Sequence, residues 1–91
     1  MSQKQSPAEV AVDMLEAVYN RYSKVVDSKH LSDMRSLESV DEPYYALSAL
    51  LAGLYMKGVR VPKEYAEKIW PIVDPEDVEV FDMYLGPRPK A

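Results

Sequence analysis

The stretch from Tyr44 to Met56 carries no charged side chain, and this feature constrains the fold more than any other. It reads YYALSALLAGLYM and has the composition of a helix. A helix that is apolar on all sides belongs in the interior of a structure. This run is shorter than the roughly 20 residues that span a bilayer, so a membrane is not predicted to cover it. In a chain of 91 residues, either the other helices cover it or a partner covers what they leave exposed.

Helix start and stop signals divide the rest of the chain. Ser6-Pro7-Ala8-Glu9 is a capping box with proline at the first helical position, and an apolar stripe continues from there to Val26. The serine-rich stretch that follows predicts only weak, frayed helix, because serine side chains compete for backbone hydrogen bonds. The predicted elements are a helix over 7–27, a weak helix over 28–40, a helix over 43–57 with an acidic cap, a helix from Pro62 that Pro71 ends or kinks, and a helix over 75–85 capped by Asp74.

These signals predict an all-α fold, a small irregular bundle of four to five helices. No run of alternating β-branched residues is longer than Val59 to Val61, so no strand is expected. We expect one helical domain over residues 6–86, a disordered N-terminus over 1–5 and a mobile C-terminal tail over 87–91.

Charge and composition narrow the class of protein. The net charge is −4, and −3 of it lies in residues 74–91. An acidic chain is a poor autonomous binder of nucleic acid, because clustered Lys and Arg supply most of that affinity. The absence of cysteine and of an apolar leader predicts a cytoplasmic protein. One asparagine, two glutamines and proline-rich loops are typical of a thermophilic source.

No constellation of reactive side chains stands out. His30 is the only histidine, and a role as general base would need orientation by Asp33, one turn away, but neither a nucleophile nor a second histidine accompanies it. The acids from Asp74 to Asp82 lack the central glycine of a calcium loop and are better explained by helix capping. We therefore predict no catalytic residue, no metal site and no cofactor.

The aromatic residues and the last helix favour a protein that binds another protein. Tyr and Trp side chains combine a large apolar area with a polar tip and are enriched at interfaces. In the last helix, Val78, Phe81 and Leu85 form one apolar line, while further apolar residues lie elsewhere around the helix. One of these faces packs on the core. Either the other face meets a partner, or the helix lies in a cleft between the other helices, which then cover both faces. The predicted interface residues are Tyr45, Met56, Trp70, Val80, Met83 and Tyr84.

The leading functional hypothesis is therefore a non-enzymatic protein–protein interaction module, either a small helical accessory subunit of a larger assembly or a homodimer. One alternative is a nucleic-acid-associated subunit that contacts phosphate through Arg60, Lys63 and Lys68. Another is a binder of an apolar small molecule, with methionines as flexible lining. No motif identifies a family. In its length, helical character and composition, the chain is similar to small accessory subunits of archaeal and viral assemblies, some of which process DNA or RNA.

Overall fold

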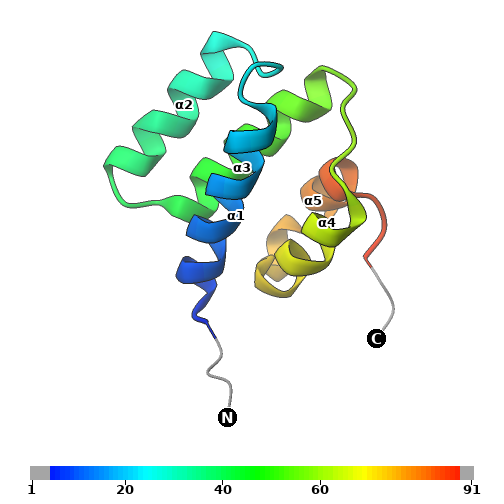
Figure 1. Cartoon of the computed structure of the whole chain (residues 1–91). Coiled ribbons are helices and arrows are strands. Elements are labelled where there is room, and N and C mark those ends of the chain that lie inside the picture. The colour runs from blue at the N-terminus through cyan, green and yellow to red at the C-terminus, as the bar shows by residue number, and fades with distance from the viewer. Residues whose placement is uncertain (1–4, 89–91) are drawn as a thin grey trace.

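Helices account for most of residues 5–88, the part of the chain that the computed structural model describes (Figure 1). The predicted all-α bundle is confirmed, and no strand occurs within this range. Residues 1–4 and 89–91, which belong to the predicted N-terminal and C-terminal tails, lie outside it. The elements are α1 (Pro7–Tyr22), α2 (Ser28–Ser39), α3 (Pro43–Met56), α4 (Lys63–Ile69), the 3₁₀ turns η1 (Trp70–Ile72) and η2 (Pro75–Asp77), and α5 (Val78–Leu85).

Helix α1 begins as its capping box predicts. The Glu9 backbone N–H donates to Ser6 Oγ over 3.1 Å, and the Ser6 N–H donates to Glu9 Oε1 over 2.8 Å. The helix ends at Tyr22, earlier than the predicted residue 27. The apolar stripe continues past this end because the chain turns there and carries Val26 inward, where its side chain is buried against α3 at Gly53.

Helix α2 is a complete helix of 12 residues, so the prediction of weak, frayed structure was wrong. Asp27 caps it, accepting the backbone N–H of His30 at 2.9 Å. Its Met34 is buried in the core, and the β-carbon of His30 lies against α3 at Gly53. At Gly53, an added β-carbon would come within 2.5 Å of Val26 Cγ1 and 2.9 Å of His30 Cβ. Packing against a glycine therefore stabilises a helix whose own sequence is a poor helix former.

Because the Asp27 carboxylate caps α2, the free energy of unfolding should depend on pH in the acidic range. The backbone N–H and the ring of His30 hold the pKa of Asp27 below its ordinary value of 3.8. A lowered folded-state pKa means that the carboxylate stabilises the fold above the ordinary pKa and that this contribution is lost as pH falls through the lowered one. Asp27→Asn should therefore reduce the loss of stability between neutral and strongly acidic pH. Denaturant titrations of both proteins across that range measure it, and identical pH profiles would contradict the capping role.

Helix α3 lies at the centre of the bundle, as its uncharged sequence predicts. Its most deeply buried side chains are Ala46, Leu47, Leu50, Leu51 and Leu54, all with no exposed surface. Helices α1 and α2 pack against it on one side, and α5 packs against it on another (Figure 1). The predicted acidic cap does not form, because Glu42 makes no side-chain hydrogen bond to the helix.

The C-terminal third of the fold is held to α3 through Tyr44. The Tyr44 hydroxyl donates to Asp77 Oδ2 over 2.7 Å and accepts the Asp74 backbone N–H at 3.1 Å. Asp74 does not cap a helix with its side chain as predicted. The predicted helix over 75–85 is instead the turn η2 followed by α5. Burial, followed by the neighbouring Asp77, raises the pKa of Tyr44, so its hydroxyl keeps the proton that it donates.

Tyr44→Phe removes this hydroxyl and leaves the ring in place. We expect the free energy of unfolding to fall by roughly 1 kcal/mol, because the Asp74 N–H and the Asp77 carboxylate each lose a partner. Denaturant titration monitored by circular dichroism measures the change. Tyr45→Phe, at the neighbouring exposed position, is the control and should leave stability unchanged. An equal effect of the two substitutions would contradict the role of the hydroxyl.

Candidate interaction surface

The outer side of α3 leaves large apolar side chains uncovered. Tyr45 at its start and Met56 at its end are 47% and 70% exposed. Ala49 and Ala52 lie between them on the same side of the helix and are half-buried. Tyr55, on a neighbouring side of the helix, is also 47% exposed. The helix wheel could not distinguish these positions, because every side of this helix is apolar.

Helix α5 extends this apolar area. Phe81 and Leu85 face inward and are buried, as the pattern predicted. Val80 and Met83 remain 40% and 52% exposed. Tyr84 is half-buried and lies between these exposed residues and the buried ones. The Tyr84 ring lies 5.8 Å from the Tyr55 ring, centroid to centroid, and so joins the two helices at the surface. We call this the α3/α5 surface, formed by Tyr45, Tyr55, Met56, Val80, Met83 and Tyr84.

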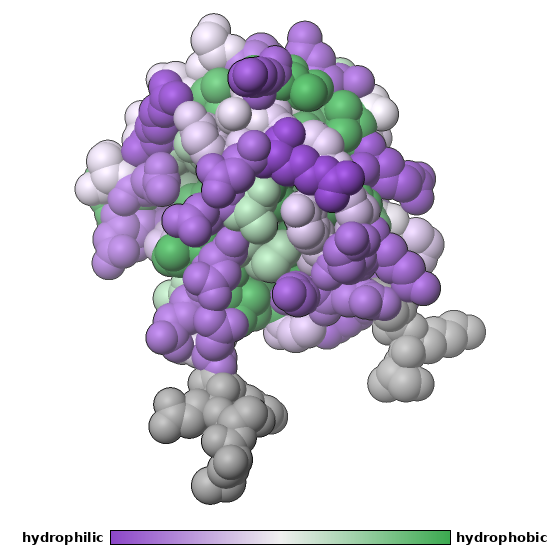
Figure 2. Space-filling model, viewed as in Figure 1, coloured by the Kyte–Doolittle hydropathy of each residue, from purple (hydrophilic) through white to green (hydrophobic). Residues whose placement is uncertain are grey.

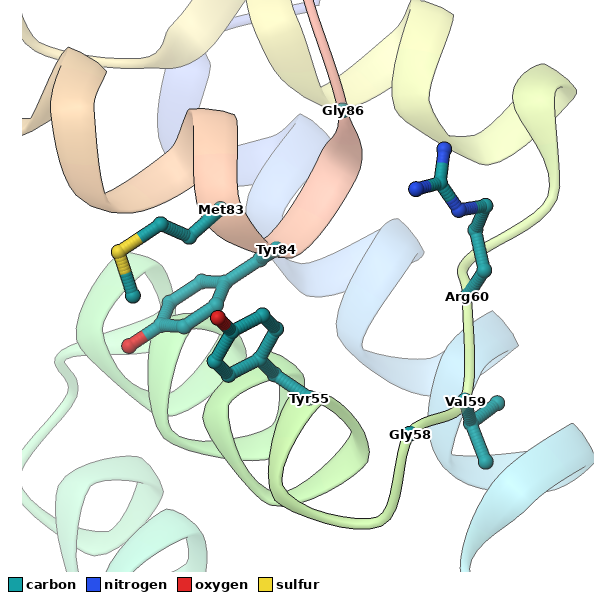
Figure 3. A pocket seen from close by; sticks show the side chains of 7 residues that line it. All are labelled: Tyr55, Gly58, Val59, Arg60, Met83, Tyr84 and Gly86. Carbon is teal, nitrogen blue, oxygen red and sulfur yellow. The ribbon is translucent and has the colours of Figure 1, made fainter.

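A small pocket lies at one end of the α3/α5 surface (Figure 3). Tyr55, Met83 and Tyr84 line one side of it, while Arg60 and its neighbours in the α3–α4 linker line the other. Its volume is about 150 Å³, which is enough for one aliphatic side chain but small for a cofactor. Burial raises the pKa of Tyr84, with a smaller effect from Tyr55, so its hydroxyl remains protonated.

The face formed by α1 and α4 differs in character. Hydrophilic side chains cover most of it, with apolar side chains visible between them (Figure 2). Large apolar side chains on α1 and in the turn after it are exposed singly, as Val12 and Val25. Single exposed apolar residues are ordinary on a protein surface, whereas several of them on two helices packed together are typical of an interaction site.

Trp70 does not belong to the surface, contrary to prediction. Its side chain is only 2% exposed and lies in the core. The Arg88 guanidinium lies over its ring at 5.5 Å from the centroid. The sequence placed Trp70 outside because Pro71 follows it, but the chain continues from α4 into η1 and keeps the ring inward.

The three cations proposed to contact phosphate are not gathered at one site. Arg60 and Lys63 line a cleft beside Leu85 and Gly86. Lys68 lines a different cleft, between α1 and η1, with Val10 and Pro71. Arg60 Nη1 lies 3.4 Å from the place that a β-carbon on Gly86 would take, close to the end of α5, where a cation is favoured by the helix dipole.

The α1–η1 cleft has a volume of about 580 Å³. Pro7, Val10, Met14, Pro71 and Ile72 line it, and Asp13 and Lys68 stand at its edge. This volume falls in the range of ligand sites, and Met14 is the methionine in its lining.

His30 has a structural partner in Asp27. His30 Nδ1 lies 2.7 Å from Asp27 Oδ1, so Asp27 rather than Asp33 orients the ring. Asp27 already caps α2, which gives this pair a structural role. Among residues 5–88, no three acidic or histidine side chains are grouped to hold a metal ion. In the same range, no helix has both the length and the apolar character needed to cross a membrane.

Comparison with known proteins gives no relative. No family model, no curated protein and no solved structure matches the chain.

Proposed function

We propose that the chain is a non-enzymatic protein–protein interaction module, a small helical subunit that docks on another protein through the α3/α5 surface. The observation that carries this proposal is the exposed apolar group that spans two helices and is joined by Tyr55 and Tyr84. Aromatic residues and methionine are enriched at protein interfaces, and clusters of them supply most of the binding energy.

The location of these side chains also supports docking. Both helices of the surface are held firmly from below, because Phe81 of α5 stacks on Tyr44 of α3 at 5.6 Å between centroids. A surface built on packed helices is preorganised, so less entropy is lost when a partner binds. Burying the exposed parts of Met56, Met83, Tyr45 and Tyr55 removes apolar surface from water, which favours a complex.

The test is affinity capture of the tagged chain from extract of its native cells, compared between variants. Met56→Glu with Met83→Glu should abolish capture of the specific partner, because each carboxylate would be buried in the interface. Val12→Glu with Val40→Glu is the matched control, since these valines are as exposed but lie on α1 and at the end of α2. Loss in the first variant and retention in the control is the expected result. Equal retention in both would overturn the proposal, and capture of nucleic acid that is lost at high salt would favour the phosphate-contacting alternative.

A further inference from the structure

We infer that the partner segment that occupies the α3/α5 surface is an amphipathic helix with basic flanks. This inference rests on the proposed function and specifies the chemistry of its partner. Two helices that lie side by side and expose apolar side chains form the kind of groove that accepts one face of a third helix. The pocket of about 150 Å³ at the end of the surface would accept one aliphatic side chain of that helix.

The charge of α5 and the turn before it gives the sign of the flanks. Between Asp74 and Pro87 the chain holds five acidic residues and no lysine or arginine. Glu79 and Asp82 are one helical turn apart, and Glu79 is one turn from Met83. Both acids therefore lie beside Met83, at the edge of the α3/α5 surface that is farther from Tyr84. Both are exposed, and neither forms an ion pair within residues 5–88.

The acidic edge formed by Glu79 and Asp82 disfavours three other occupants of the surface: a second copy of the chain, nucleic acid and anionic lipid. A second copy of the chain would meet the same surface in a two-fold dimer, so the unpaired acids of α5 would be present twice within one interface. Nucleic acid and anionic lipid would be repelled by the same carboxylates. A helix with Lys or Arg beside its apolar stripe instead places a cation against each acid, which favours both encounter and orientation.

Three synthetic peptides test the inference with the intact chain. The first is helical, with leucines along one face and lysines beside them. The second has glutamate in place of every lysine, and the third has the composition of the first with its leucines scattered. Binding is followed by fluorescence anisotropy at low and high salt, and the contacted residues are mapped by NMR. We expect the basic amphipathic peptide to bind about tenfold more tightly than the acidic one, with the difference shrinking as salt rises. The scattered peptide should bind weakly.

Charge reversal on the protein provides the specific control. Glu79→Lys with Asp82→Lys should invert the preference between the basic and acidic peptides. Asp13→Lys with Glu16→Lys makes the same change on α1 and should preserve the preference. NMR shifts should centre on Met56, Val80 and Met83.

The alternative outcomes separate the inference from the proposed function. Equal or tighter binding of the acidic peptide would overturn the basic partner and leave apolar docking intact. If sedimentation shows that the chain is a dimer, and Met56→Glu with Met83→Glu dissociates it, then the partner at the α3/α5 surface is a second copy of the chain and not a basic helix. If no peptide binds the surface and the native associations survive the same substitutions, the proposed function itself fails.

Discussion

Phe81→Ala should lower the free energy of unfolding by about 3–5 kcal/mol, the usual cost of truncating a buried aromatic ring. The Phe81 side chain is 1% exposed, stacks on Tyr44 and contacts Tyr84 at 6.0 Å between ring centroids. Phe81 therefore links α5 to α3 from the buried side, beneath the surface contact of Tyr84 with Tyr55. Since small domains are stable by only about 5–15 kcal/mol, this loss should be visible as a marked drop in the denaturation midpoint.

Phe81→Leu is the control for this substitution, because it keeps an apolar side chain of considerable volume in the same place. It should cost much less than alanine. A loss below about 1 kcal/mol in Phe81→Ala would mean that α5 is not packed on α3 as described. The α3/α5 surface would then not exist as a preorganised unit.

Gly53→Ala should destabilise the protein by roughly 1–3 kcal/mol, although alanine is normally the better helix former by about 1 kcal/mol. The added methyl group would overlap Val26 and His30, and His30 Cβ cannot move without its backbone. Helix α2 would therefore shift away from α3. Denaturant titration measures the change in stability, and hydrogen exchange locates it in α2.

Ser48→Ala is the matched control within the same helix. Ser48 is only half-buried, so alanine there should follow helix propensity and leave stability equal or slightly higher. If Gly53→Ala also stabilised the protein, the close approach of α2 to α3 would be contradicted.

Local sequence signals predicted those parts of the fold that depend on local chemistry. The capping box of Ser6 and Glu9, the uncharged run of α3 and the two-sided pattern of α5 each act within a few residues, and each is confirmed. Helix α2 was underestimated because its stability comes from Gly53, far away in the sequence, rather than from its own serines.

The candidate surface was predictable only in part, for a related reason. The pattern of α5 separated Val80 and Met83 from the core residues Phe81 and Leu85, and the structure places them so. Trp70 was misplaced because its burial depends on how one helix turns against another. A helix wheel shows which residues share a side, but in a helix that is apolar all round it does not show which side remains uncovered.

The most direct measurement of the docking proposal uses the methionines of the chain as reporters. Met56 and Met83 are exposed on the α3/α5 surface, whereas Met14 and Met34 are buried in the core at 4% and 3% exposure. Brief treatment with hydrogen peroxide, followed by mass spectrometry, oxidises accessible methionines to the sulfoxide. The purified chain should be oxidised at Met56 and Met83 but not at Met14 or Met34. In native-cell extract, Met56 and Met83 should become protected; if both stay as reactive there as in the purified chain, the α3/α5 surface is not where a partner docks.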